Sequence, residues 1–266
     1  MKGQNPNDGL GFIFGKFQGG NTKKSVMNFA NGTLREDGGP FVKKEHSISY
    51  LESHDDNTMG DFIRMGNKDV KAGEVIQDID KNAKLTPDQL TLNKLAALFL
   101  FTSRGPLMVH EGQEYARSKV IPKTSVPDTN AGKIDHNSYD KDNETNYLNY
   151  NQVEMNRALV DYYKGLISLR KTHPAFANAP KSAVKQFKTE DDFFIAYQIL
   201  KKASGKIGKD YIVLLNGDPK KAQALELPKG DWKIIANGEK IDLSGSIGSA
   251  SGSINVPPTS GIVLMK

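Results

Sequence analysis

The feature that most constrains this chain is a change of residue pattern near residue 180. The last arginine is Arg170, and beyond residue 180 short apolar runs are separated by turn residues such as Gly, Pro, Asn and Asp. Such runs are typical of antiparallel strands, so we expect residues 181–266 to form a β-sandwich, with the Gly- and Ser-rich stretch Ser244–Ser253 as a mobile loop. The strands are expected at Val184–Phe187, Phe193–Leu200, Tyr211–Leu215, Ala222–Leu227, Trp232–Ala236 and Ile262–Met265.

Residues 1–180 contain two helical patterns. Thr86-Pro87-Asp88-Gln89 combines a hydroxyl cap, a proline at the first helical position and a glutamine three residues after the cap, which predicts the start of a helix. Apolar residues at helical spacing continue this helix until Gly105-Pro106 ends it. A second helix is predicted over residues 155–169, where Met155 begins an apolar face, and His173-Pro174 closes it.

Two further runs have the pattern of buried strands, and each leads directly into a polar cluster. They are Ser47–Leu51 and Leu107–His110. In barrels of parallel strands, the carboxyl ends of the strands carry the active site. We therefore expect functional side chains in the loops that follow these two runs.

The loop after the first run is Glu52–Thr58, the densest cluster of ionisable residues. Three interpretations are open from its composition. It could be a capped turn leading into a helix, a metal site built from one histidine and two carboxylates, or a catalytic loop. Neighbouring residues on a strand point to opposite faces, which argues against His54 and Asp55 binding one ion together.

Two more loops carry polar clusters. In residues 109–119 we expect Arg117 to form ion pairs with Glu111 and Glu114 that stiffen the loop. In residues 135–146 the alternation of Asp140, Asp142 and Glu144 resembles a calcium loop, but the turn glycine and distal glutamate of an EF-hand are missing. We favour a polar sugar-binding loop there. The tyrosines that could stack on sugars are Tyr139, Tyr147 and Tyr150.

Together these segments resemble the pullulanases of the α-amylase superfamily, glycoside hydrolase family 13. Tyr50–Asp55 is similar to the His-Asp motif after the seventh barrel strand, and Asp161–Phe176 resembles the last barrel helix. The eighth-strand region of pullulanases is similar to Gly105-Pro106, Gly112–Lys119 and Asn137-Ser138-Tyr139, with Asn146 and Tyr150 behind them. Four matches in chain order make the resemblance specific, and residues 181–266 match the family as a C-terminal β-sandwich.

The resemblance implies an α/β fold in which residues 1–180 are the C-terminal segments of a (β/α)8 catalytic barrel and residues 181–266 a β-sandwich domain. His54 and Asp55 would hold the sugar at the cleavage subsite. Glu52 is expected to face the barrel wall or an ion-pair partner. The weaker candidates for neighbouring sugar contacts are Asn143, Asn146 and Tyr139.

Two departures from the family pattern bear on the substrate. Asp56 stands where pullulanases usually have asparagine, and Tyr150 where they usually have tryptophan. A third departure bears on catalysis. Retaining glycosidases need a nucleophile and an acid about 5 Å apart, which the family takes from its fourth and fifth strands. A barrel of about 250 residues does not fit within residues 1–180, so we expect its first half to be missing.

The expected function is therefore that of the C-terminal portion of an enzyme that cleaves α-1,6 branch linkages in pullulan or starch-like α-glucans by a retaining mechanism. The chain alone is expected to be inactive. Its expected partners are an α-glucan and the missing N-terminal half of the barrel. Alternatives that stay open are α-1,4 hydrolysis or glucan transfer, a noncatalytic glucan-binding fragment and an unrelated metal hydrolase.

Composition argues against several other classes of protein. The net charge of +5 is diffuse, and no basic element with interleaved aromatics indicates a nucleic-acid partner. No apolar run approaches the length of a membrane span. The absence of cysteine excludes disulfides and thiolate sites but leaves the compartment open. No cofactor or metal is expected in this chain, while calcium in the intact enzyme stays open.

Overall fold

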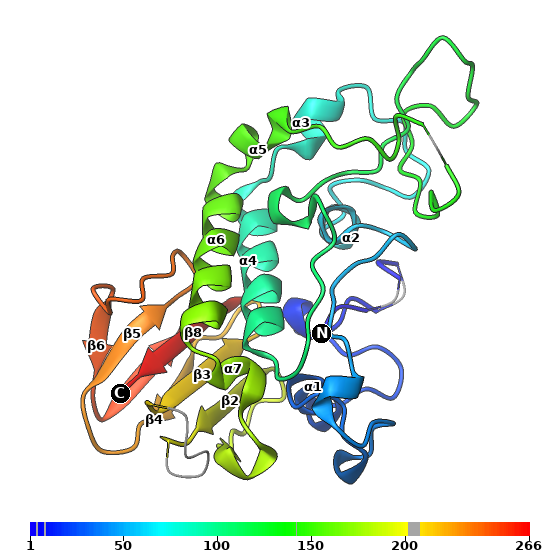
Figure 1. Ribbon diagram of the computed structural model, residues 1–266. Coiled ribbons are helices and arrows are strands. Elements are labelled where there is room, and N and C mark those ends of the chain that lie inside the picture. Colours follow the sequence, from blue (N-terminus) through cyan, green and yellow to red (C-terminus); the bar gives the residue numbers. More distant parts are fainter. Residues whose placement is uncertain (4, 8, 142, 202–207) are drawn as a thin grey trace.

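The computed structural model describes residues 1–3, 5–7, 9–141, 143–201 and 208–266, with helices before residue 184 and strands after it (Figure 1). No described helix is long and apolar enough to span a bilayer. The α-helices are α1 (Lys23–Ala30), α2 (Met59–Gly66), α3 (Ile79–Ala83), α4 (Pro87–Thr102), α5 (Asn151–Met155), α6 (Arg157–Thr172) and α7 (Ala175–Asn178). Short 3-10 turns are Phe12–Phe14, Arg35–Asp37, Lys44–His46, Gln113–Tyr115 and Lys181–Ala183. The strands are β1 (Val184–Gln186), β2 (Phe194–Ile199), β3 (Tyr211–Asn216), β4 (Gln223–Glu226), β5 (Trp232–Ala236), β6 (Gly248–Ala250), β7 (Ser253–Val256) and β8 (Ser260–Met265).

Helix α4 begins and ends as its sequence predicts. The Thr86 side chain accepts a hydrogen bond from the Gln89 amide (3.3 Å), and the Gln89 side chain accepts one from the Thr86 amide (3.2 Å). This capping box satisfies amides that would otherwise lack partners at the helix start. At the other end, the Arg170 guanidinium donates to the carbonyls of Phe101 and Ser103, both at 2.7 Å. A cation thereby satisfies carbonyls at the negative end of the helix.

Helix α6 packs beside α4 with the predicted apolar face, although it starts later than expected. Leu159, Tyr162, Leu166 and Leu169 are buried. Met155 belongs instead to the short helix α5 and is 37% exposed, so its assignment to the buried face is wrong. The chain turns at residue 156 between the two helices, which takes Met155 out of the heptad-like spacing.

The strands form a six-stranded antiparallel sheet in the order β1-β2-β3-β8-β5-β6, with a two-stranded sheet β4-β7 beside it. Every residue of β2, β3 and β8 is buried because both faces of the large sheet are covered. One face packs on α4 and α6. The other packs on β4 and β7 around Trp232, which agrees with the predicted sandwich.

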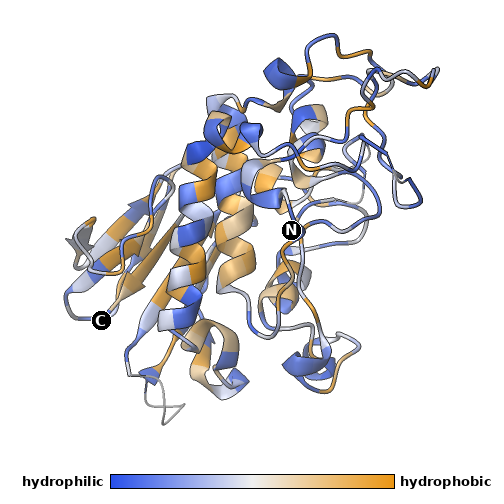
Figure 2. Ribbon diagram, turned by 45° about the horizontal axis from the view of Figure 1, so that its top comes forward, coloured by the Kyte–Doolittle hydropathy of each residue, from blue (hydrophilic) through white to orange (hydrophobic). Residues whose placement is uncertain are grey.

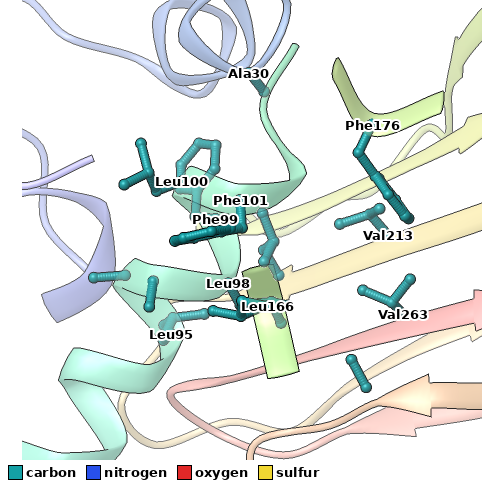
Figure 3. Close-up of a cluster of buried hydrophobic side chains, with 14 of the residues drawn as sticks. Ala30, Leu95, Leu98, Phe99, Leu100, Phe101, Leu166, Phe176, Val213 and Val263 are labelled. Carbon is teal, nitrogen blue, oxygen red and sulfur yellow. The ribbon is translucent and has the colours of Figure 1, made fainter. Parts of the chain in front are cut away.

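The helices and the large sheet share one core. In the close-up, Phe99 of α4 and Leu166 of α6 lie near Val213 of β3 and Val263 of β8 (Figure 3). Hydropathy follows the same arrangement, because α4, enclosed between its neighbours, is hydrophobic along most of its length (Figure 2). The boundary predicted at residues 180 and 181 coincides with the change from helices to strands, but its role as a domain division stays a prediction.

The two predicted strands in the first part are not regular strands. Ser49 and Leu107 form an isolated parallel bridge, in which the Ser49 amide donates to the Pro106 carbonyl (3.0 Å) and the Met108 amide donates to the Ser49 carbonyl (2.9 Å). The pairing is parallel, as in a barrel. A regular ladder needs consecutive pairs, and among the described residues this stretch pairs only at Ser49 and Leu107, so it forms a bridge and not a strand.

In the second part, the Gly- and Ser-rich stretch Ser244–Ser253 is not a loop throughout. Strand β6 lies within it and pairs with β5, and β7 begins at its last residue and pairs with β4. Small residues with low β-propensity can still complete a sheet edge, because the backbone supplies the hydrogen bonds. The six strands predicted from alternation are confirmed, with ends shifted by one or two residues.

Candidate functional site

The three polar clusters meet at one hollow of about 250 Å³. It lies where the loop after the first extended run, the loop after the second and the tyrosine-containing loop come together. These segments are separated by tens of residues, so only the fold unites them. The residues that line the hollow are His54, His110, Glu111, Arg117, Lys119, Tyr139, Asn146 and Leu148.

The loop of residues 52–58 divides into a buried anchor and an exposed tip. Glu52 is 2% exposed, accepts a hydrogen bond from the Met59 amide and contacts His110 Nδ1 at 3.1 Å. This agrees with the expectation that Glu52 faces an ionic partner. Thr58 caps α2 by accepting from the Asp61 amide, and its hydroxyl donates to the Arg117 carbonyl at 2.7 Å. The loop is therefore fixed at both ends.

His54 and Asp55 form the exposed tip. Their side chains are 69% and 58% exposed, with His54 Nε2 3.4 Å from Asp55 Oδ2. His54 lines the hollow, and its ring lies 6.5 Å from that of Tyr139 in an edge-on arrangement. The imidazole and carboxylate can thus reach a molecule that approaches from solvent, while Tyr139, itself 59% exposed, offers a ring face next to them.

A buried ion pair on helix α2 holds the second loop against the hollow. Asp61 accepts hydrogen bonds from the Ser118 hydroxyl (2.6 Å) and the Lys119 amide (2.8 Å), and it pairs with Arg64 (3.3 Å). Arg64 also donates to the Ala116 carbonyl at 3.0 Å. Because both side chains are almost fully buried and saturated with partners, residues 116–119 are held rigidly.

Two cations of this loop, Arg117 and Lys119, line the hollow. Lys119 is 1% exposed, and its Nζ donates to the carbonyls of His54 (3.1 Å) and His136 (3.3 Å). Burial, and then the nearby charge of Arg117, lower the pKa of Lys119. The ammonium therefore connects the His54 tip to the third loop through backbone carbonyls.

Arg117 does not form the expected ion pairs. Among the described residues its partners are the Thr145 carbonyl (3.3 Å) and Asn146 Oδ1 (3.4 Å). Glu114 instead accepts from the Gly112 amide, and Glu111 accepts from the Tyr150 hydroxyl. The expectation of a self-contained ionic loop is wrong, because the guanidinium spans to the third loop rather than folding back on its own.

The third loop holds its shape through Asn146. Its amide nitrogen donates to the carbonyls of Ser138 and Lys141, both at 2.6 Å, and its oxygen accepts from the Ser138 hydroxyl at 2.7 Å. Asn143 accepts from the Thr145 amide at 3.0 Å and does not line the hollow. Sugar contacts by Asn143 or Asn146 stay predictions. The hydrogen bonds that these two residues form lie within the third loop, which carries Tyr139.

The described residues contain no group of three or more His, Asp or Glu side chains that could hold a metal ion. Of the alternating acidic residues considered for calcium, Asp142 lies outside the described residues. Lys119 and His110 belong to the polar segment predicted from the sequence but were given no role there, and the Asp61–Arg64 pair was not predicted as part of this site. Asp61 and Arg64, three positions apart within α2, are a sequence signal for an ion pair, but the loop residues that they bind are more than fifty residues away in sequence.

Comparison with known proteins agrees with the resemblance predicted from the sequence. A family model for the all-beta domain of pullulanase matches residues 182–240. Pullulanase of Bacillus subtilis (strain 168) is 27% identical over 176 residues, covering 65% of this chain and 21% of that protein. Pullulanase A of Streptococcus pneumoniae serotype 4 is 26% identical over 212 residues, covering 65% and 16%.

Solved structures give the same result for the fold. Pullulanase from Bacillus acidopullulyticus superposes with a TM-score of 0.76 at 25% identity, covering 97% of this chain and 28% of that one. Pullulanase from Anoxybacillus sp. LM18-11, complexed with maltotetraose, has a TM-score of 0.70 at 23% identity, covering 97% and 32%. The chain thus spans about a fifth of the curated relatives, and it is pullulanase-like, corresponding to their C-terminal part.

Proposed function

We propose that this chain is the C-terminal part of a glycoside hydrolase of pullulanase type, which cleaves α-1,6 linkages in branched α-glucans by a retaining mechanism. The observation that carries the proposal is the meeting of His54, Tyr139 and the Arg117–Lys119 loop around one hollow. These are the segments through which the sequence resembles pullulanases. The maltotetraose bound to a pullulanase of the same fold supports an α-glucan as the ligand.

The proposed chemistry uses the exposed His54–Asp55 tip. Positive charge grows on the sugar ring in the oxocarbenium-like transition state, and hydrogen bonds to the ring hydroxyls strengthen as it does so. The Asp55 carboxylate accepts such bonds and the His54 imidazole donates or accepts them. The tyrosine ring beside them supplies an apolar surface for the sugar face. In this proposal, His54 and Asp55 contact the sugar most strongly in the transition state.

We assign the nucleophile and the general acid to residues outside this chain. A retaining enzyme needs two carboxyl groups about 5 Å apart that flank the scissile bond. Glu111 is the carboxylate that lines the hollow, and the Tyr150 hydroxyl donates to it. Because no second carboxylate lines the hollow beside Glu111, the described residues do not supply the pair that catalysis needs. We therefore expect the nucleophile and the acid to come from another part of the enzyme.

The surface beside the Ser49–Leu107 bridge is suited to pairing with further strands from a partner. Ile48, Tyr50 and Met108 are 61%, 55% and 38% exposed. The amides of Ile48 and Tyr50 point away from the bridge, because Ser49 makes both of its bonds to the neighbouring segment, and they have no partner in the described part of the chain. Parallel sheets are normally covered on both faces. The N-terminal half of the barrel is the partner we propose for this surface.

A noncatalytic glucan-binding role is the second candidate for the chain by itself. It is favoured by the same hollow, which has a tyrosine platform, two cations and a single lining carboxylate. Such a site can bind sugar without cleaving it. The two candidates differ in what happens when catalytic carboxylates are restored.

The experiment therefore compares the chain alone with the chain fused to the N-terminal barrel half of a pullulanase. Both proteins are run through gels that contain pullulan and assayed for reducing ends on pullulan and on linear amylose. We expect retardation of the chain without hydrolysis, and hydrolysis of pullulan by the fusion. Cleavage of amylose but not pullulan by the fusion would overturn the α-1,6 assignment. A fusion that binds pullulan but cleaves neither polymer would favour the noncatalytic role.

A further inference from the structure

The sequence contains three Asn-Gly dipeptides, Asn31-Gly32, Asn216-Gly217 and Asn237-Gly238. In such a dipeptide the backbone nitrogen of glycine can attack the side-chain carbonyl carbon of asparagine, because glycine has no Cβ to hinder the approach. The product is a five-membered succinimide ring, which water then opens. Whether a folded protein permits this reaction depends on the contacts of the two residues, and these contacts differ among the three dipeptides.

Asn216-Gly217 is held by hydrogen bonds at both reacting groups. Asn216 is fully buried, and its side-chain nitrogen donates to three backbone carbonyls at 2.8 to 3.2 Å. The Gly217 amide donates to the Phe193 carbonyl at 2.8 Å. The attacking nitrogen and the leaving nitrogen are therefore both occupied in the folded chain.

Asn31-Gly32, at the end of α1, is protected by burial and by one hydrogen bond. Asn31 is 5% exposed. The Gly32 amide donates to the Phe29 carbonyl at 3.1 Å. The attacking nitrogen is again occupied, and water has little access to the asparagine.

Asn237-Gly238, in the turn after β5, has both reacting groups free. The two residues are half-buried, and neither the Gly238 amide nor the Asn237 side-chain nitrogen donates to any described group. The side-chain oxygen of Asn237 accepts hydrogen bonds from the amides of Glu239 (2.9 Å) and Lys240 (2.8 Å). These two amides stabilise the negative charge that this oxygen gains when the carbon beside it is attacked.

We infer that Asn237-Gly238 is a site of spontaneous conversion to isoaspartate. The Gly238 nitrogen loses its proton and forms a bond to Asn237 Cγ, and the side-chain nitrogen leaves as ammonia. Water then opens the ring at one of two carbons. Addition at Cγ yields aspartate, whereas addition at the main-chain carbonyl carbon of residue 237 yields isoaspartate, in which the chain runs through Cγ and that carbonyl becomes a free carboxylate. Water is the only other reactant, and the inference does not depend on the proposed function.

The turn that contains Asn237 attaches the sandwich to two helices. The buried Tyr162 hydroxyl of α6 donates to the Asn237 carbonyl at 2.8 Å, and Lys94 Nζ of α4 donates to the Glu239 carbonyl at 2.8 Å. Isoaspartate adds a methylene to the main chain between these two contacts and removes the carbonyl that Tyr162 binds. The turn cannot keep both contacts in their present geometry, so we expect isoaspartate to weaken the attachment.

The test ages the full chain at mildly alkaline pH, digests it with trypsin and measures by mass spectrometry the deamidated fraction of three peptides. They are residues 25–35, 210–220 and 234–240, each of which contains one Asn-Gly dipeptide. We expect 234–240 to convert at least about tenfold faster than the other two, because their glycine amides must first break a hydrogen bond. Equal rates in the folded chain, or no conversion of 234–240, would overturn the inference.

Ageing the chain in urea separates the effect of the fold from that of the neighbouring residues. The contacts of all three dipeptides are lost there, so we expect comparable rates. A lead of 234–240 that persists unchanged in urea would mean that the fold does not select this site.

Asn237→Asp is the matched control for the effect on stability, because it has the charge of the product without the additional methylene. We expect the isoaspartyl chain, purified by ion exchange, to unfold at a lower urea concentration than Asn237→Asp. Equal unfolding midpoints for the two proteins would refute the weakened attachment of the turn to α4 and α6.

Discussion

His110 Nδ1 lies 3.1 Å from Glu52 Oε1, which joins the last residue of the second extended segment of the first part to the residue that follows the first. The second oxygen of Glu52 accepts a hydrogen bond from the Met59 amide at the start of α2. One buried carboxylate thereby ties together the bridge formed by Ser49 and Leu107, the helix that follows, and the floor of the hollow. The His54–Asp55 tip is exposed, but it projects from this fixed base.

Substitution of Glu52 should lower the stability of the folded chain. We expect Glu52→Ala to destabilise the chain by about 2–3 kcal/mol, because the His110 ring and the Met59 amide lose a buried acceptor. Glu52→Gln retains one acceptor oxygen and should cost less. Urea unfolding followed by circular dichroism measures both variants, and equal unfolding midpoints for Glu52→Ala and the wild type would contradict this role.

Arg170 should be the most important cation of α6. It donates to the carbonyls of Phe101, Ser103 and Gly105, and burial lowers its pKa to about 10, so it stays protonated at neutral pH. Arg170→Leu leaves three carbonyls unpaired, and we expect a loss of about 3 kcal/mol. Arg157→Leu on the same helix removes only an exposed pair with Glu154 and should cost less than about 0.5 kcal/mol. Thermal unfolding of the two variants tests the contrast.

His173 should make the stability of the chain depend on pH. Burial, and secondly the charge of Lys209, lower the pKa of His173 below its ordinary value of 6.5, and its Nδ1 lies 3.0 Å from the Tyr211 hydroxyl. The folded state therefore binds fewer protons than the unfolded state. Stability is fully present above 6.5 and falls as the pH drops through that value toward the lower folded pKa. Urea midpoints between about pH 8 and pH 5 should fall for the wild type, and this His173-dependent part of the fall should be absent in His173→Gln.

Asp55 should matter for turnover rather than for binding. In a fusion that restores the two catalytic carboxylates, we expect Asp55→Asn to reduce turnover about a hundredfold with little change in the Michaelis constant, because its hydrogen bonds strengthen in the transition state. His54→Ala should have the same effect in milder form. An Asp55→Asn fusion with normal turnover and a raised Michaelis constant would mean that Asp55 binds substrate and transition state equally.

Arg117 should act through the loop that it reaches. Its contacts to Thr145 and Asn146 tie the second loop to the third, so Arg117→Ala should lower the melting temperature and weaken glucan binding together. Arg35→Ala, at an exposed turn remote from the hollow in the chain, serves as the charge-matched control and should change neither. A variant with an unchanged melting temperature and weaker binding would indicate that Arg117 touches the sugar directly.

Much of the fold could be predicted from residues that lie close together in the sequence. The start of α4 follows from the cap at Thr86 and the glutamine at position 89, which act within one turn of helix. The strands β2, β3, β4, β5 and β8 follow from apolar runs long enough to be recognised without knowledge of their neighbours. The same holds for the His54–Asp55 motif, whose resemblance to pullulanases rests on consecutive residues.

The tertiary structure decided what depends on partners distant in sequence. Arg117 pairs with the third loop rather than with the nearby glutamates, because the fold brings Thr145 and Asn146 within reach of its guanidinium. Gly248–Ala250 becomes a strand because β5 offers it an edge, whatever its own propensity. The Gly238 amide, which donates to no described group, could not be foreseen either, since a missing hydrogen bond is a property of everything that surrounds a group and leaves no trace in the residue itself.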